Sequence, residues 1–355
     1  YLAEKSLNLF EKSYEFFFIG GKVSNKFLVT LIKRKIFISS FVSLIYSANR
    51  LIKGYEKYEY IPAVIRNYGS RDLSGVLPKT KPHLEFLKEE NYRGKDFLKK
   101  IGCNKKFICL SIRDSAYLTN SFPENDFTYH DYRDSDINTY KKAINYLIDK
   151  DYFIIRMGKM VNDEFDITNS NFFDYAVSDK KEDFLDIWLM ANCEFCVSTS
   201  TGLDNVSDIF RVPIVYVNAL AHANFSSWNP RCIWVPKKII SKHDNKELSL
   251  NELIQNGAIG FPEKGTFQEV LDKNNLTFIN NSEDEILDGV IEMHKKLNGI
   301  WKNSIEIENK QKVFWNRLKT WNRFKFNHNI KQDNPIGIIS DTYLEKNKEW
   351  FLDEY

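Results

Sequence analysis

Four consecutive hydroxyl residues and a glycine, at positions 198–202, connect an apolar segment to a helical one. Residues 195–197 suit the end of a buried strand, and residues 203–210 have the pattern of a short helix. In this order the first amides of the helix point outward, and the positive end of its dipole attracts an anion. The candidate phosphate ligands are Ser198, Thr199, Ser200, Thr201 and Gly202. Taken alone, the turn is explained equally well as a Ser or Thr cap on an ordinary α/β helix.

Cationic side chains follow two other apolar segments. Arg113 comes directly after residues 106–112, and Arg156 and Lys159 lie at the end of the next apolar run. A guanidinium group can bind two phosphate oxygens at once, and an ammonium group adds a compact positive charge. We predict that these three cations neutralise a diphosphate. The competing interpretation of Arg113 is a structural ion pair with its neighbour Asp114.

Residues 130–136 are dense in ionisable side chains and precede an amphipathic segment. His130 titrates near neutral pH, which suits a general base that removes a proton from a sugar hydroxyl. Asp136 and Asp114 are further candidates for this role. Asp136 could instead cap the next helix, and a solvated polar loop accounts for any single member of the group.

Strands and helices alternate from about residue 104 onward, as in a parallel sheet covered by helices on both faces. Segments typical of buried strands are residues 106–112, 152–157, 172–175, 195–197 and 212–217. Segments typical of helices are residues 137–150, 184–191, 203–210, 286–297, 309–324 and 342–352. Because ligands of such sheets bind at the carboxyl ends of the strands, we expect Arg113, Arg156 and the turn 198–202 to converge there.

The first part of the chain reads differently. Up to about residue 75, apolar residues recur at spacings of three and four, as in helices, and a short helix is predicted at 83–90. We therefore predict a smaller, largely helical region at residues 1–100 and a Rossmann-like domain with C-terminal helices at 101–355. Residues 27–46 are apolar on both sides of a basic cluster, so they suit a buried helix or a helix on an anionic membrane surface.

Composition narrows the classes of function. With 50 basic and 48 acidic residues the net charge is +2, which gives no general attraction to nucleic acid. The five cysteines, an odd number, argue against a disulfide framework, and the CxxC at Cys193 suits packing better than metal binding. No apolar run is long enough for a transmembrane helix, which favours the cytoplasm, with peripheral contact to the inner face of the membrane left open. The chain begins with Tyr1, so further residues can precede it.

Together these motifs resemble a group of bacterial glycosyltransferases of surface-polysaccharide biosynthesis, such as O-antigen and capsule synthesis. The resemblance covers residues 105–350 and rests on the segments 109–114, 132–137, 155–159, 184–189 and 198–202. More distantly, the chain is similar to the donor half of fucosyltransferases with the GT-B fold. There an arginine contacts the donor diphosphate and a later turn binds phosphate, which implies those roles for Arg113 and the turn. Asp114 departs from the pattern, since it directly follows the arginine.

The sequence therefore predicts a metal-independent glycosyltransferase of GT-B-like, α/β architecture. Its donor would be a nucleotide sugar, without a further cofactor, and its acceptor a hydroxyl of a glycan or lipid-linked glycan. A non-catalytic sugar-nucleotide or glycan-binding module is the alternative. The chain has no GxGxxG dinucleotide loop for a redox epimerase and no evident nucleophile or metal cluster for a phosphatase.

Overall fold

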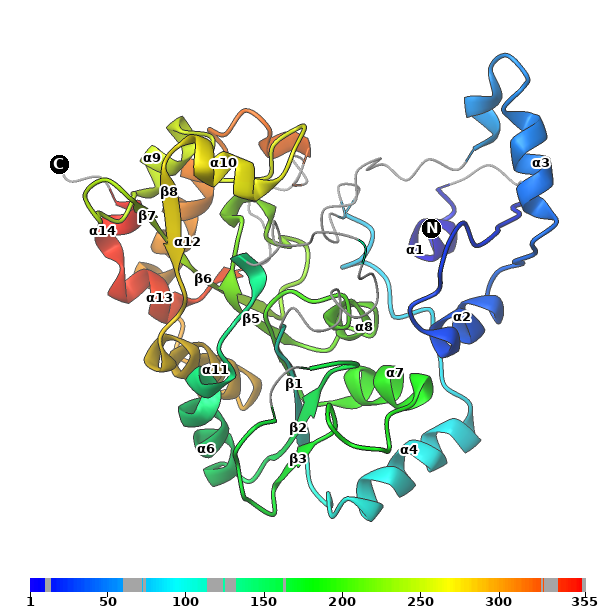
Figure 1. Ribbon diagram of the computed structural model, residues 1–355, viewed down its shortest axis with the longest axis horizontal. Helices are drawn as coiled ribbons and strands as arrows, with labels where there is room; N and C mark the ends of the chain where they lie inside the picture. Colours follow the sequence, from blue (N-terminus) through cyan, green and yellow to red (C-terminus); the bar gives the residue numbers. More distant parts are fainter. Residues whose placement is uncertain are drawn as a thin grey trace.

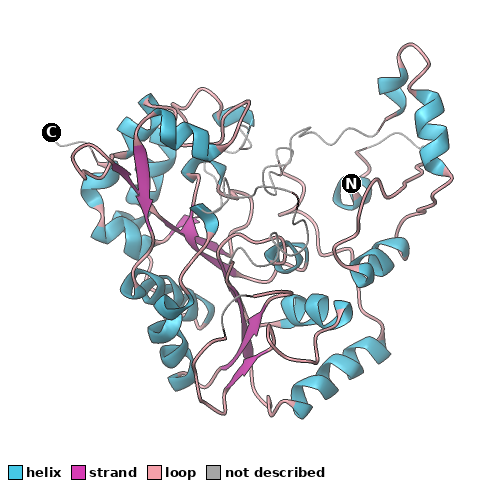
Figure 2. Ribbon diagram, viewed as in Figure 1, coloured by secondary structure: helices cyan, strands magenta, loops and turns pink. Residues whose placement is uncertain are grey.

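The computed structural model describes residues 1–9, 14–59, 72, 75–113, 124, 132–161, 164–326, 328 and 338–352. Within these residues the central element is a sheet of seven strands, all parallel (Figure 1, Figure 2). Its strands are β1 (Phe107–Ser111), β2 (Phe153–Met157), β3 (Phe172–Asp174), β4 (Cys196–Ser198), β5 (Ile214–Ala219), β6 (Cys232–Pro236) and β9 (Ile338–Ile339). The predicted Rossmann-like α/β class is confirmed.

The strand order is β3-β2-β1-β4-β5-β6-β9. From β1 the chain moves outward through β2 to β3, and then returns to place β4 on the other side of β1. The direction of winding thus reverses between β1 and β4. Sheets of this kind leave a crevice for ligands at such a reversal, which is called the switch point. Ser111 pairs with Ser198 in the register of these two strands, so β1 and β4 end at the same level.

Helices cover both faces of the sheet, and this explains why the strands are continuous apolar runs. Helices α6 (Lys141–Asp149) and α11 (Glu283–Leu297) pack together on one face (Figure 1). Helices α7 (Asp183–Asn192) and α8 (Asp204–Ile209) lie on the other, with α4 (Lys88–Lys100) packed against α7. The side chains of β1, β2, β4 and β5 are buried throughout.

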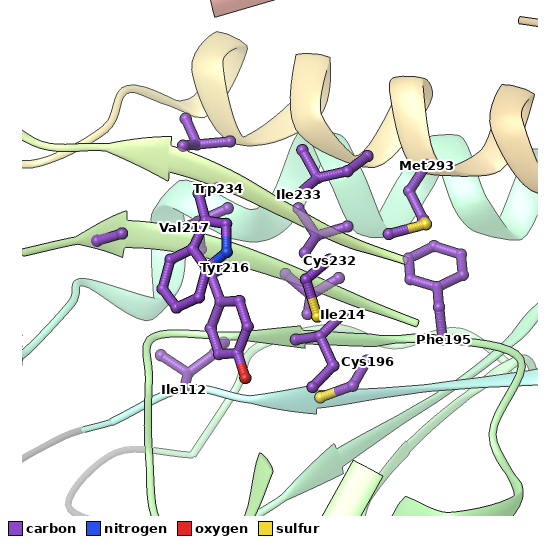
Figure 3. Close-up of a cluster of buried hydrophobic side chains, with 14 of the residues drawn as sticks. Ile112, Phe195, Cys196, Ile214, Tyr216, Val217, Cys232, Ile233, Trp234 and Met293 are labelled. Carbon is purple, nitrogen blue, oxygen red and sulfur yellow. The ribbon is translucent and has the colours of Figure 1, made fainter. Parts of the chain in front are cut away.

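The core on the two faces of the sheet is rich in aromatic and sulfur-containing side chains (Figure 3). Tyr216 and Trp234, on neighbouring strands, stack with their ring centroids 3.9 Å apart. All five cysteines are buried and have free thiols. Cys193 and Cys196 therefore have a packing role, as predicted.

After β6 the chain departs from a simple alternation of strands and helices. An antiparallel pair, β7 (Lys238–Ser241) and β8 (Leu276–Ile279), encloses the short helices α9 (Leu250–Gln255) and α10 (Phe267–Lys273). Helices α12 (Ile305–Leu318), α13 (Asp341–Lys346) and α14 (Lys348–Phe351) follow, close to the predicted positions. Strands β6 to β8 and helices α9 and α10 were not predicted from the sequence.

The N-terminal region is helical only in short pieces: α1 (Leu2–Ser6), α2 (Lys26–Lys33), α3 (Val42–Asn49) and the 3₁₀ turn η1 (Tyr55–Tyr58). The expected helix around residues 14–18 is wrong, because Phe17 instead forms a parallel bridge with Ile38. The expected helix at 83–90 is also wrong, since α4 begins only at Lys88. In the described part of the chain, none of the helices has the length and apolar character needed to span a bilayer.

Helix α2 packs against α7 of the sheet domain. Asn25 caps α2 and its side chain donates to the carbonyl oxygen of Asp183, while the Asp183 carboxylate accepts from the amide of Lys26 at 2.7 Å. Phe27 packs edge-to-face on Phe184, with centroids 5.0 Å apart. These contacts hold α2 beside the carboxyl edge of the sheet.

Candidate functional site

A cavity of about 600 Å³ opens at the carboxyl edge of the sheet, beside the point where the strand order reverses. One wall consists of residues at or after the ends of β1, β2 and β4: Ser111, Ile112, Arg113, Met157, Gly158, Lys159, Met160, Val161, Thr201, Gly202 and Leu203. The opposite wall is α2 with the residues before it: Val23, Ser24, Asn25, Leu28, Val29 and Ile32. Ligand pockets are commonly apolar with a few convergent polar groups, and this cavity has that character.

The charged side chains of the cavity are strongly unequal in sign. Among its described lining residues, three are cations, Arg113, Arg133 and Lys159, and one is a carboxylate, Asp186. Several fixed cations in an otherwise apolar cavity favour an anionic ligand, since their charges are less screened than in water.

Arg113 is held from two directions. Its backbone amide donates to the Thr199 hydroxyl at 2.9 Å, which ties the loop after β1 to the turn after β4. Its Nε donates to Asp134 Oδ1 at 3.0 Å, and the side chain is 13% exposed. An arginine fixed in this way through Nε can direct its terminal nitrogens at a ligand.

Arg133 lies on the segment that precedes α6 and also reaches the turn after β4. Its terminal Nη2 donates to the carbonyl oxygen of Ser200. Burial lowers the pKa of Arg133, and the neighbouring charge of Arg113 lowers it further. Two guanidinium groups are therefore close together in a partly desolvated place, which an anion between them would stabilise.

The turn 198–202 is hydrogen-bonded to a carboxylate of the helix that follows it. Asp204 Oδ2 accepts from the Ser198 hydroxyl at 2.5 Å and from the Thr201 amide at 2.6 Å. Ser198 and Thr199 are buried, and it is Ser200, with φ of 62°, that takes the left-handed conformation in the turn. Helix α8 is only six residues long. Of the predicted phosphate ligands, the structure brings Thr201 and Gly202 to the cavity, and the amide of Thr201 is engaged by Asp204.

Asp204 is 3% exposed, and burial raises its pKa to about 7. The hydrogen bonds that it accepts oppose this effect, because they stabilise the charged form. The Asp204 carboxyl group therefore gains or loses a proton near neutral pH, in the turn beside the switch point.

Lys159 joins the two walls of the cavity. Its Nζ donates to the carbonyl oxygen of Ser24 at 3.0 Å and lies 3.7 Å from Asp183 Oδ1. Gly158, just before it, leaves no room for a side chain, because a Cβ there would come within 2.9 Å of Val161. The cation thus lies where the N-terminal region meets the loop after β2.

Two of the remaining predicted residues, Arg156 and Asp136, do not line this cavity. Arg156 is 2% exposed within β2 and forms an ion pair with Asp174 of β3 at 3.0 Å, and it is not among the lining residues. Asp136 is exposed and caps the 3₁₀ turn η3 (Ile137–Tyr140), which is the alternative considered for it. Asp114 and His130 lie outside the described residues.

Sequence reasoning missed Asp186, which lies in the first turn of α7 and lines the cavity. Its Oδ1 accepts from the Tyr175 hydroxyl at 3.0 Å. Burial raises the pKa of Asp186 to about 6. A carboxylate flanked on both sides by apolar residues, 184–185 and 187–190, was the available signal, since such a residue faces a cavity or a buried partner.

Sequence reasoning also missed Lys237, which is completely buried between β6 and β7. Its Nζ donates to the carbonyl oxygens of Tyr132 at 2.6 Å and Asp134 at 3.3 Å. Burial lowers the pKa of Lys237 to about 7. This lysine anchors the segment that carries Arg133 and the Asp134 partner of Arg113.

Comparison with known protein families, curated proteins and solved structures finds no match for this chain.

Proposed function

We propose that the protein is a glycosyltransferase of GT-B-like architecture that uses a nucleotide-sugar donor. The observation that carries the proposal is the grouping of Arg113, Arg133 and Lys159 with one carboxylate, Asp186, in a single cavity at the switch point. A nucleotide sugar presents a diphosphate, which needs cations, and an anomeric carbon, whose substitution needs a base for the incoming hydroxyl.

In this proposal the acceptor oxygen attacks the anomeric carbon and the bond from that carbon to the diphosphate oxygen breaks. Negative charge then builds on the departing diphosphate. Arg113 and Arg133 stabilise this charge, and Lys159, which follows β2 on the same wall as Arg113, adds a third positive charge. Fixed donors of this kind are worth ~3–4 kcal/mol each in the transition state.

Asp186 accepts the proton that the acceptor hydroxyl loses. Its hydrogen bond from Tyr175 fixes the carboxyl group, and its pKa of about 6 leaves it mostly ionised at neutral pH yet basic enough to take a proton. His130 and Asp114, which the sequence suggested for this role, stay predictions.

The wall made by α2 gives the N-terminal region a part in binding. Leu28, Val29 and Ile32 face the cavity opposite the cationic wall. We assign this apolar wall to the acceptor side, in keeping with the GT-B arrangement of a donor domain facing an acceptor region. A glycan or lipid-linked glycan presents apolar faces that suit it.

The experiment that tests the proposal is incubation with UDP-, GDP-, ADP- and CDP-linked sugars, followed by chromatography of the free nucleotide. Release of a nucleoside diphosphate from one donor by the wild type, and its loss in Arg113→Ala, supports a transferase. Arg93→Ala, an exposed arginine on α4, is the matched control and should behave as wild type. Tight binding of a nucleotide sugar without any turnover, even with glycan acceptors added, would instead identify a binding module.

A further inference from the structure

Helix α3 (Val42–Asn49) presents an apolar face to the surroundings of the molecule. Phe41, Leu44 and Ile45 are 65%, 65% and 52% exposed, and Leu51 and Ile52 beyond the helix are 88% and 59% exposed. Phe41 lies three and four positions before Leu44 and Ile45, which places these three along one side of the helix, a side that in a globular protein normally packs inward. In Figure 1 this helix lies at one extreme of the molecule, away from the sheet.

A second group of exposed apolar side chains adjoins this helix in the sequence. Phe16 and Phe37 pack edge-to-face with centroids 5.9 Å apart, and both remain exposed. A parallel bridge between Phe17 and Ile38 holds the two segments that carry Phe16 and Phe37 side by side. Among the described residues, ten of the 18 exposed large apolar side chains lie within residues 14–59. We call Phe16, Phe37, Phe41, Leu44, Ile45 and Ile52 the N-terminal apolar surface.

The same segment is basic. Residues 14–59 contain eight Lys and Arg residues and three Glu residues, in a chain whose net charge is only +2. Arg34 and Lys35 form ion pairs with Glu90 and Glu85 of the neighbouring segment. Lys33, Lys53 and Lys57 are exposed on or near the two helices. An apolar stripe bordered by Lys and Arg is the pattern of a segment that lies in the boundary region of a bilayer.

We propose that the N-terminal apolar surface binds the surface of an anionic lipid bilayer. The apolar side chains would enter the region between headgroups and acyl chains, and the basic residues would contact lipid phosphates. Charge complementarity favours this occupant over a second copy of the chain, because two copies would bring like charges together. The proposal goes beyond glycosyl transfer and does not depend on it.

Vesicle sedimentation tests the proposal with the whole chain. The wild type should sediment with phosphatidylcholine vesicles that contain about 30% phosphatidylglycerol and remain in solution with phosphatidylcholine alone. The double variant Leu44→Glu, Ile45→Glu should lower the partition coefficient about tenfold or more, since it places carboxylates in the apolar stripe. Ile305→Glu is the matched control, because Ile305 is 77% exposed but lies far along the chain on α12, and it should not change binding.

A second variant tests the contribution of the basic residues to vesicle binding. Replacing Lys33, Lys53 and Lys57 by Gln should weaken binding to anionic vesicles, and raising the salt to about 0.5 M should weaken binding of the wild type in the same way. Lys180→Gln, a half-exposed lysine before α7, should leave binding unchanged. Circular dichroism establishes that each variant is folded.

Two results would overturn the proposal. One is that the folded wild type fails to bind anionic vesicles, or that the Leu44→Glu, Ile45→Glu variant binds them as tightly as the wild type does. The other is a dimer in sedimentation velocity that these substitutions dissociate, which would assign the surface to a second copy of the chain. Neither result bears on donor turnover, so the glycosyltransferase proposal would stand or fall separately.

Discussion

The hydroxyl groups of Ser111 and Thr201 lie 2.8 Å apart and join the ends of β1 and β4. The two residues are 90 positions apart in the sequence. Together with the Arg113 amide bound to Thr199, this contact sets the position of the cationic loop relative to the turn after β4. Direct hydrogen bonds thus connect the two chain segments at the switch point, and residues of both segments line the cavity.

A double-mutant cycle measures this contact. Ser111→Ala and Thr201→Val should each lower the free energy of unfolding, and their effects should be coupled by about 1 kcal/mol, the typical worth of one hydrogen bond. Urea denaturation provides the values. Ser111→Ala combined with Thr266→Val, which removes the cap of α10, should give additive effects. Additive effects for Ser111 and Thr201 would show that the two hydroxyls do not interact.

Asp186 predicts the pH dependence of turnover. A base must be unprotonated, so turnover should fall as the pH is lowered through about 6, the raised pKa of this carboxyl. Asp186→Asn keeps an acceptor for the Tyr175 hydroxyl but cannot take a proton, and should lower turnover about 10²- to 10⁴-fold. Initial rates between pH 5 and 8 check both points. Asp179→Asn, an exposed carboxylate before α7, should retain the wild-type profile. An unchanged profile in Asp186→Asn would assign the base to another residue.

Asp204 predicts a pH dependence of stability. Its pKa is raised by burial to about 7 in the folded protein, so the folded state holds the proton more tightly than the unfolded chain. The stabilisation that this group gives the folded state is therefore fully present below the pKa that it has in the unfolded chain. It is lost as the pH rises through about 7, the pKa in the folded protein. Asp204→Asn removes the titration, so its free energy of unfolding relative to wild type should increase by about 2–3 kcal/mol between pH 5 and 8. Urea denaturation at the two pH values tests this, and a constant difference would contradict it.

The proposed chemistry places the charge of the leaving group on arginine and lysine side chains. Donor turnover should therefore survive treatment with EDTA, and added Mg²⁺ should not raise it more than about twofold. Turnover that is abolished by the chelator and restored by a divalent cation would mean that a metal carries part of this charge.

The sheet could be predicted from the sequence because its strands are short, continuous apolar runs between amphipathic segments. The predicted strands at residues 106–112 and 152–157 correspond to β1 and β2, with small differences at their ends. The short β3 was also predicted, although its three residues are only partly buried. Local patterns were sufficient here because helices on both faces demand apolar strands.

The site was predictable only in part, because side-chain partners depend on tertiary structure. Arg156 lies inside β2, whereas Arg113 follows the end of β1, and a carboxylate on the strand next to β2, Asp174, pairs with Arg156. The hydroxyl-rich turn suggested an open anion site, and Asp204, three residues after Thr201, engages its amide. Asp186 became visible as a site residue only when α7 was placed beside the cavity.

The N-terminal region was the least predictable part. Periodicity of three and four occurs in residues 27–51, but it continues across a break between α2 and α3. Leu31 of α2 is buried, whereas Leu44 of α3 is exposed. A hydrophobic stripe indicates that a helix has an apolar face, and it does not indicate what that face contacts.

The central claim is that Arg113 and Arg133 form a diphosphate site. Calorimetric titration of the wild type, Arg113→Ala and Arg133→Ala with UDP, GDP, ADP and CDP, and with the corresponding nucleosides, tests it most directly. We predict that one nucleoside diphosphate binds the wild type far more tightly than its nucleoside does. Each substitution should raise its Kd at least about tenfold, since each removes charge-assisted hydrogen bonds. Equal affinity of folded wild type and variants for every diphosphate, or no binding at all, would contradict the account.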